Sequence, residues 1–256
     1  MSGQLVEAQV HHWLVLLIFA LAALVFILLM RVNAPYGRFL RAGWGPTIPA
    51  KTAWVIFESP AVILFAVVYF AGRNALELAP LVLLGIWQFH YIVRTVVFPL
   101  RIQGSGKRIP LVVVVTAIGF NVVNAYINAR WVSDLGSYPD DWLLSAPFLI
   151  GVTMFVGGWI VNQRADRVLS NLRQPGESHY SVPRGGLYRY VSCPNYLGEM
   201  LEWLGWAILT WSLAGAAFAA FTIANLLPRA IATHRWYQDT FPDYPDSRKA
   251  VIPFVV

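Results

Sequence analysis

The chain has 256 residues, of which 57% are hydrophobic and only 12% are charged, and its formal net charge at neutral pH is +6. Soluble domains carry about 25% charged residues, so this composition excludes a protein surrounded by water alone. Together with a mean hydropathy of +0.56, it indicates an integral membrane protein.

Seven apolar segments approach the length of about 20 residues that a helix needs to cross a bilayer. The first is too long for the core of a signal peptide and lacks a basic leader, so we expect it to be a span as well. The sixth is the shortest. Nothing else resembles a separate soluble domain, so we predict an all-α, polytopic membrane protein with seven transmembrane helices in one domain, residues 1–256. The expected spans are His12–Met30, Ala53–Ala71, Leu78–Leu100, Leu111–Trp131, Leu143–Val161, Leu197–Trp211 and Ala214–Thr233.

The distribution of basic residues predicts the orientation. Seven spans place the termini on opposite sides, and Lys and Arg gather on the cytoplasmic side of membrane proteins. With the N-terminus outside, the cytoplasmic segments hold all of the 19 Lys and Arg except Arg73, Arg94 and Arg130, and the outer loop "SDLGSYPDDW" is acidic. We therefore expect a cytoplasmic C-terminus, in a bacterial inner membrane or, in a eukaryote, in the endoplasmic reticulum. A basic cytoplasmic face explains the pI near 9.6 without a nucleic-acid partner.

Ionisable and polar residues lie inside two neighbouring spans. The second span contains Glu58 in "WVIFESPAVIL", and the third contains His90, Tyr91 and Arg94 in "WQFHYIVRTVVF". At a rise of about 1.5 Å per residue, Glu58 and Tyr91 lie at one depth, roughly 10–14 Å from the cytoplasmic ends of their helices. Because ionisable groups inside a membrane are costly, they indicate a functional site.

Further polar residues lie at the cytoplasmic ends of the fifth, sixth and seventh spans. They would form a polar mouth, with the acid and the phenol deeper in apolar surroundings. Such a cavity suits a phosphate-bearing nucleotide at the mouth and an apolar substrate further in. No G-x-G-x-x-G or Walker motif is present, so a Rossmann turn or a P-loop is not expected. The residues at the mouth are Asn162, Asp166, Arg173, Asn195, Glu199, Glu202, Arg229, His234 and Tyr237.

Other polar residues favour structural roles. The stripe Asn121, Asn124 and Asn128 suits hydrogen bonds between helices. Glu202 has two readings, a site residue or the partner of a nearby arginine. The single cysteine, Cys193, excludes an intramolecular disulfide, and a lone Cys before Pro is usually a small packing residue.

Residues 162–256 closely resemble the steroid 5α-reductase family, the 3-oxo-5α-steroid 4-dehydrogenases. The resemblance depends on "LRQPGESHYSVPRGGLYRYVSCPNYLGEMLEWLGWAILTWSL", "YQDTFPDYPDSRKAVIPF" and "HYIVRT", supported by "FESP" and "YPDDW". The first 50 residues are similar only in hydropathy. More distant relatives, which include the enoyl-CoA reductases of fatty-acid elongation, share a weaker form of the C-terminal pattern.

The resemblance implies that NADPH, entering from the cytosol, reduces the Δ4 double bond of a 3-oxo steroid in a seven-helix fold. Glu58 and Tyr91 match the family's pair that holds the substrate carbonyl. Arg94 and Trp54 match positions that line the same cavity, Arg94 on the cofactor side and Trp54 on the substrate side. The other cofactor-binding positions matched are Asn162, Asp166, Arg173, Tyr180, Asn195, Glu199, Arg229 and Tyr237.

Two departures from the family pattern affect the expected cofactor contacts. The loop after the third span reads "RIQGSGKRIP" instead of a form like R-G-R-P, so Lys107 or Arg108 is expected to replace the phosphate contact. The family's His-rich run is reduced to "ATHRWY", which leaves Thr233 and His234.

The implied reaction delivers hydride to steroid C5 and builds negative charge on the carbonyl oxygen. Hydrogen-bond donors aimed at that oxygen stabilise the transition state. Tyr91 is such a donor, and Glu58 is one when an apolar environment keeps it protonated. We expect the steroid to enter from the membrane, with no metal and no obligate protein partner.

Two alternatives remain open from the sequence. One is an enoyl-thioester or other sterol double-bond reductase. The other is a transporter or a non-catalytic membrane scaffold, although the sequence contains no internal repeat of the kind that transporters often show.

Overall fold

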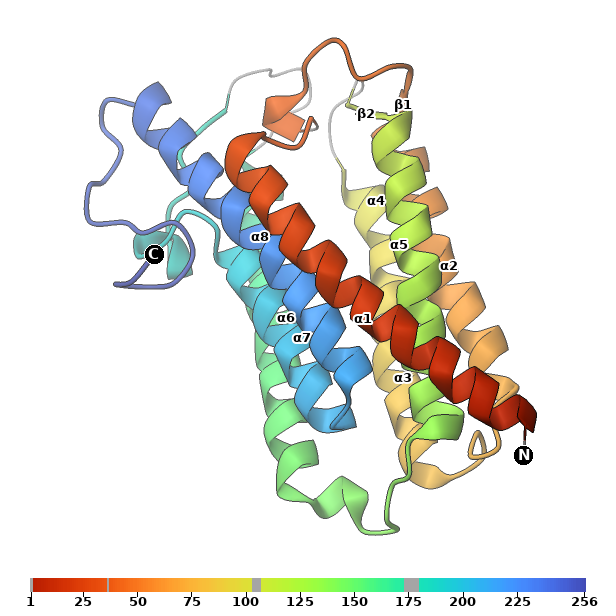
Figure 1. Ribbon diagram of the computed structural model, residues 1–256. Coiled ribbons are helices and arrows are strands. Elements are labelled where there is room, and N and C mark those ends of the chain that lie inside the picture. The colour runs from red at the N-terminus through yellow and green to blue at the C-terminus, as the bar shows by residue number, and fades with distance from the viewer. Residues whose placement is uncertain (1, 36, 103–106, 173–179) are drawn as a thin grey trace.

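The computed structural model describes residues 2–35, 37–102, 107–172 and 180–256. In these residues the chain is a bundle of long helices (Figure 1). The predicted all-α fold with seven helices is confirmed. The helices are α1 Ser2–Arg31, α2 Ala50–Phe70, α3 Leu78–Ile92, α5 Leu111–Arg130, α6 Ala146–Asn171, α7 Pro194–Thr210 and α8 Leu213–Thr240.

Six helices of the described chain are long and apolar enough to cross a membrane, and α7, with 17 residues, is the short one. Hydrogen bonds hold both of its ends against neighbouring segments. Near its start, Asn162 of α6 donates to the carbonyl of Asn195 at 3.0 Å. Near its end, Trp142 in the loop before α6 donates to the carbonyl of Leu209 at 3.1 Å. The chain is therefore a polytopic integral membrane protein.

Two helices contain a turn of π-helix. The helix α3 continues through the π-turn Val93–Val97 into α4, Phe98–Arg101. The helix α5 continues through the π-turn Trp131–Leu135. Single π-turns often occur at functional sites, because the extra residue changes the direction in which side chains point. The first of them carries Arg94.

A small antiparallel sheet joins two of the helix starts. Strand β1, Thr47–Pro49, leads into α2, and strand β2, Arg108–Pro110, leads into α5. The guanidinium of Arg108 donates from Nε to Thr47 Oγ1 at 2.7 Å. The sheet thus fixes the starts of α2 and α5 beside each other (Figure 1). The short 3₁₀ helices are Gly37–Phe39, Trp142–Leu144 and Gly186–Arg189.

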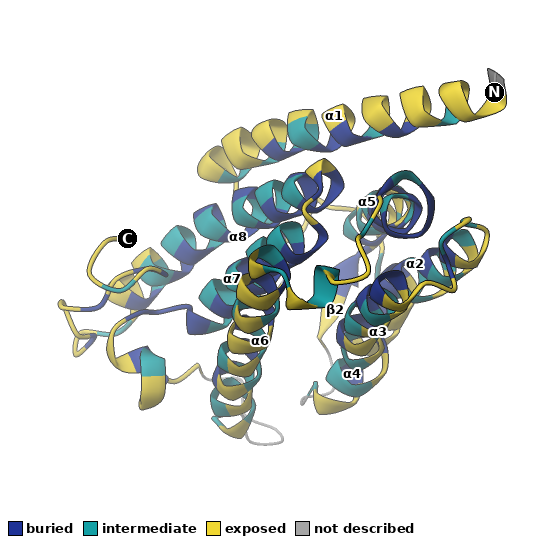
Figure 2. Cartoon of the chain, turned by 90° about the horizontal axis from the view of Figure 1, so that it is seen from below, coloured by how far each residue is buried: buried dark blue, intermediate teal, exposed yellow. Residues whose placement is uncertain are grey.

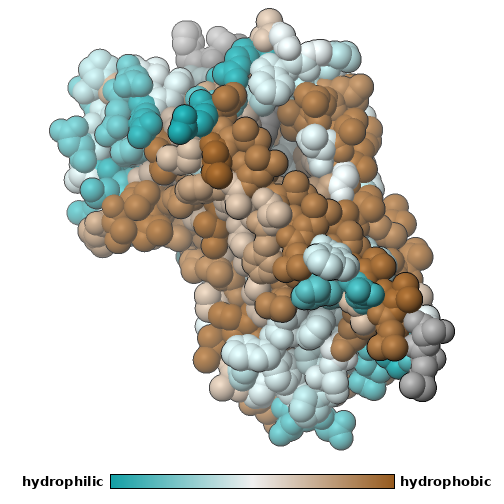
Figure 3. All heavy atoms as spheres, viewed as in Figure 1, coloured by the Kyte–Doolittle hydropathy of each residue, from teal (hydrophilic) through white to brown (hydrophobic). Residues whose placement is uncertain are grey.

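The outer faces of the helices are apolar, as lipid contact requires. Exposed residues predominate along one whole face of α1 (Figure 2). Large apolar side chains such as Ile63, Val67 and Leu78 are more than 60% exposed. Figure 3 shows brown apolar surface over the middle of the molecule and hydrophilic surface at its two ends.

Each of the three basic residues outside the predicted cytoplasmic segments forms an ion pair with an acidic side chain, which explains how its charge is accommodated there. Arg73 binds Asp134 at 2.8 Å, and Arg130 binds both Asp134 at 2.9 Å and Glu7 at 2.6 Å. Arg94 lies between two glutamates, which are described below. Figure 1 places the N-terminus at the end of the bundle opposite β1 and β2. The N-outside orientation stays a prediction.

Glycines let α6 and α7 approach to backbone contact. A Cβ atom added at Gly158 of α6 would lie 2.5 Å from the Gly198 carbonyl oxygen, and one added at Gly198 of α7 would lie 2.5 Å from the Asn162 nitrogen. Small residues allow such close packing in membranes, where van der Waals contact drives helix association. This contact places the polar end of α6 against the polar start of α7.

We predict that Gly198→Ala lowers the thermal unfolding midpoint of the detergent-purified protein. The added methyl group has no space, and overpacking typically costs about 1–3 kcal/mol. The matched control is Gly157→Ala, because a Cβ at the exposed Gly157 meets nothing within 4 Å. Equal midpoints for the two variants would contradict the close α6–α7 contact.

Candidate active site

A buried chain of charges joins three helical segments. Glu58 of α2 is 7% exposed, and its Oε1 lies 3.4 Å from Nε of Arg94 in the π-turn after α3. The Arg94 Nη2 atom lies 3.2 Å from Oε1 of Glu199 on α7. Buried charges need opposite partners, because removing them from water is unfavourable. Arg94 therefore ties α2 and α3 to α7 through two carboxyl groups.

Aromatic rings hold the Arg94 guanidinium from the side. Its central carbon lies 4.6 Å from the centre of the Trp54 ring and 5.1 Å from that of Phe98. Trp54 lies one helical turn before Glu58, so both residues share a face of α2. The structure thus places Trp54, Glu58 and Arg94 together, as the sequence predicted.

Tyr91 lies one turn before Arg94 and is only 3% exposed. Its ring packs against two tryptophan rings. The distance between ring centres is 4.7 Å to Trp87 and 5.6 Å to Trp203. Its hydroxyl makes no hydrogen bond to another described residue. Aromatic side chains therefore hold a phenol donor one helical turn before the arginine that contacts Glu58.

Asn121 also belongs to this site, although the sequence favoured a purely structural role for it. From α5 it donates to the Phe57 carbonyl at 2.6 Å and lies 3.4 Å from Glu58 Oε2. Of the other two asparagines in the stripe, Asn128 makes the expected bond between helices, because it accepts from Trp206 of α7 at 2.8 Å. It also donates to Asn124, whose own amide nitrogen has no partner among the described residues. Only the packing of α5 on α2 distinguishes Asn121 from the other two.

Glu202 pairs with a histidine and not with an arginine. His90 Nδ1 and Glu202 Oε1 are 2.5 Å apart, and both side chains are buried. The second oxygen of Glu202 has no hydrogen-bond partner among the described residues. This pair joins α3 to α7.

The expected mouth residues of α6 and α7 also come together. Asn195 donates its side-chain amide to Asp166 at 3.1 Å, and its carbonyl accepts from Asn162 at 3.0 Å. Because Asn195 and Glu199 are one turn apart on α7, this group is continuous with the Arg94 site.

A third group surrounds an arginine that sequence reasoning missed. Arg38, from the segment between α1 and β1, lies over the rings of Tyr180 at 5.2 Å, Trp236 at 4.5 Å and Tyr237 at 4.7 Å. It also donates to the Tyr237 hydroxyl at 3.4 Å. The position of Arg38 outside every span gave no signal beyond its positive charge.

The other residues predicted for the mouth have separate partners or lie outside the described residues. Arg229 donates to the Tyr196 hydroxyl at 3.3 Å. His234 Nδ1 lies 2.6 Å from Ser192 Oγ. Arg173 lies outside the described residues. Arg108 donates a hydrogen bond to Thr47 of the small sheet.

Cys193 precedes α7 and is buried. Burial raises the pKa of its thiol to about 12. The thiol is therefore protonated at neutral pH, which agrees with a packing role. Among the described residues, no cluster of three or more His, Cys, Asp or Glu could hold a metal ion.

Comparison with known proteins adds a family relation to this geometry. A family model described as 3-oxo-5-alpha-steroid 4-dehydrogenase matches residues 107–256. The chain is 44% identical over 254 residues to steroid 5-alpha-reductase DET2 of Gossypium hirsutum, with 97% of this chain and 98% of that protein covered. It is 43% identical over 230 residues to 3-oxo-5-alpha-steroid 4-dehydrogenase 1 of Rattus norvegicus, covering 89% and 88%. The human 3-oxo-5-alpha-steroid 4-dehydrogenase 1 is 39% identical over 239 residues, covering 92% of each chain.

We predict that Arg94→Gln strongly destabilises the protein, because it leaves two buried carboxyl groups without their cation. Breaking a buried pair costs about 3–5 kcal/mol. The added substitution Glu199→Gln removes one of the excess charges and should restore part of this loss. The measurement is the thermal midpoint of the two single variants and the double variant, with Arg101→Gln at the exposed end of α4 as the control. Strictly additive effects would contradict the shared ion pair.

Proposed function

The chain belongs to the 3-oxo-5-alpha-steroid 4-dehydrogenase family, and we propose that it reduces the Δ4 double bond of 3-oxo steroids with NADPH as the hydride donor. The observation that carries this proposal is the combination of two findings. The relatives match nearly the whole chain, and the membrane interior contains a buried acid, Glu58, and a buried phenol, Tyr91, which lies one helical turn before the arginine that contacts this acid. The relatives reported above are named as reductases and dehydrogenases, so the transporter and scaffold alternatives are set aside.

The chemistry of the mouth residues fits a phosphorylated dinucleotide. Arg38 and Arg229 supply guanidinium groups, which suit phosphate oxygens, and Arg38 Nη1 is buried without a partner among the described residues. The side chains of Asn162, Asp166 and Asn195 supply donors and acceptors of the kind that ribose and carboxamide groups need. When bound, NADPH supplies the hydride.

Tyr91 and Glu58 are proposed to bind the steroid carbonyl. The reduction places negative charge on that oxygen, and a preorganised donor stabilises the charge in the transition state. The Tyr91 hydroxyl, without a partner among the described residues, is available as such a donor. The bulky aromatic wall behind it fixes the direction of the hydrogen bond.

Charge balance favours a protonated Glu58. One arginine faces two carboxyl groups and can neutralise only one negative charge. If both carboxyl groups were ionised, one negative charge would stay uncompensated in this buried site, which is unfavourable. Arg94 lies closer to Glu199, at 3.2 Å, than to Glu58, at 3.4 Å, and the Glu58 side chain is the less exposed, 9% against 15%. Glu58 is therefore the carboxyl that holds the proton, which makes it a second donor toward the carbonyl.

The function itself is tested with the detergent-purified chain and two substrates. Oxidation of NADPH is followed in the presence of a Δ4-3-oxo steroid and, separately, of an enoyl-CoA. We expect turnover with the steroid. Turnover with the thioester alone would favour the wider group of double-bond reductases instead.

We predict that Tyr91→Phe and Glu58→Gln lower kcat while NADPH still binds. Loss of the Tyr91 donor to a developing oxyanion reduces turnover by about 10²–10³-fold, and the amide that Glu58→Gln introduces is a weaker hydrogen-bond donor than a protonated carboxyl group. The control is Tyr138→Phe, which removes a hydroxyl bonded to the Thr210 carbonyl at the far end of α7. Loss of NADPH binding in a folded Tyr91 or Glu58 variant would show that the two residues belong to the cofactor subsite.

We predict that Arg38→Gln weakens NADPH binding by about 10- to 100-fold, because a charge-assisted hydrogen bond contributes about 1.5–3 kcal/mol. Steroid affinity should stay the same. Arg41→Gln is the matched control, since Arg41 lies three residues away at the exposed surface. Separate titrations of cofactor and steroid measure both affinities, and an Arg38 variant with normal NADPH affinity would limit this residue to packing.

A further inference from the structure

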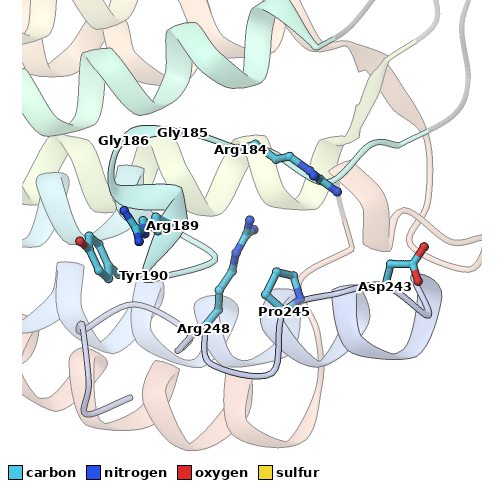
Figure 4. A pocket seen from close by; sticks show the side chains of 8 residues that line it. All are labelled: Arg184, Gly185, Gly186, Arg189, Tyr190, Asp243, Pro245 and Arg248. Atoms are coloured by element: carbon cyan, nitrogen blue, oxygen red, sulfur yellow. The ribbon is translucent and has the colours of Figure 1, made fainter.

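A basic pocket is lined by residues other than those of the Arg94 site. It is a cavity of about 680 Å³ between residues 184–190 and the C-terminal segment, residues 243–248. Three arginines line it, Arg184, Arg189 and Arg248, against a single acid, Asp243. Figure 4 shows the side chain of Arg248 extending toward the space between Arg189 and Arg184, with Asp243 on the far side of Pro245. The lining thus has an excess of positive charge.

Arg248 is the unusual member of this set. It is only 5% exposed, and its Nε and Nη1 atoms have no hydrogen-bond partner among the described residues. A buried guanidinium with unsatisfied donors is unfavourable, so its position indicates a missing acceptor. The backbone there is fixed, because Lys249 donates to the Tyr190 carbonyl at 2.9 Å and its own carbonyl accepts from Ser192 at 2.9 Å.

Apolar surface adjoins the basic pocket. Tyr190 lines the pocket and packs against Phe254, with 5.7 Å between the centres of the two rings. Phe254 is 81% exposed and Val255 is 67% exposed. In Figure 3, brown surface lies directly below the hydrophilic cap on the side where Figure 1 places the C-terminal segment. Exposed aromatic and aliphatic groups beside arginines are typical of the interface between lipid headgroups and acyl chains.

We propose that this pocket binds the phosphate headgroup of an anionic phospholipid, with its acyl chains beside Tyr190 and the C-terminal segment. Guanidinium groups bind phosphate oxygens with two parallel hydrogen bonds. Basic pockets on the cytoplasmic side of membrane proteins bind acidic lipid headgroups for the same reason. The headgroup supplies the acceptors that Arg248 lacks.

The test compares two double variants of the full chain in detergent. Arg184→Gln with Arg189→Gln removes two exposed charges from the pocket and leaves Arg248 in place. Arg164→Gln with Arg235→Gln removes two exposed charges elsewhere and is the matched control. Native mass spectrometry titrates phosphatidylglycerol and, separately, phosphatidylcholine with the same acyl chains.

We expect the wild-type protein to retain phosphatidylglycerol in preference to phosphatidylcholine. The pocket variant should bind phosphatidylglycerol roughly 10- to 30-fold more weakly, and the control should bind it normally. Equal retention of the two lipids, or equal losses in both double variants, would overturn the proposal.

Two further measurements separate the other sources of phosphate. Normal lipid binding with weakened NADPH binding in the pocket variant would assign the pocket to a cofactor phosphate and overturn the proposal. Displacement of the lipid by an equal concentration of inorganic phosphate would show a site for free phosphate, with the same consequence. We expect neither effect.

Discussion

The position of Arg94 between Glu58 and Glu199 is the constraint on which the candidate site depends. One guanidinium connects the acid of α2, at the level of the predicted substrate carbonyl, with the acid at the mouth of α7. In a low-dielectric interior such contacts are strong, and a missing partner is correspondingly unfavourable. The π-turn in the third span allows this arrangement, because it carries Arg94 while Tyr91 stays on the preceding helical face. The same contact therefore fixes the relative positions of the proposed substrate and cofactor subsites.

The close packing of α6 on α7 supports this arrangement from the other side. The glycines at their interface bring Asn162 and Asp166 within hydrogen-bond distance of Asn195. Since Asn195 and Glu199 share a face of α7, the helix contact also sets the distance from the mouth to Arg94. A structure that depends on backbone contact tolerates little change in side-chain volume at these glycines.

The sequence predicted the spans and the depth of the polar residues but not their partners. Hydropathy located all seven helices, and the expected boundaries differ from the observed ones mainly where helices extend beyond the apolar core, as α6 does to Asn171. The common depth of Glu58 and Tyr91 followed from helical rise alone. The pairing of Glu202 with His90, and the contact of Asn121 with Glu58, depend on how each helix is rotated against its neighbour. Arg38 contacts Tyr237 from a segment that has no hydrophobic periodicity, so no sequence pattern predicted this contact. The roles of these residues in binding stay predictions.

We propose that this membrane site directs hydride from the cofactor to the carbon β to a polarised carbonyl. The most direct measurement is the reduction of a Δ4-3-oxo steroid with NADPH deuterated at the transferring position of nicotinamide C4, in ordinary water, followed by NMR of the product. We expect one deuterium at steroid C5 and none at steroid C4, which takes its hydrogen as a proton. Deuterium at steroid C4, or an unlabelled reduced product, would contradict the proposal.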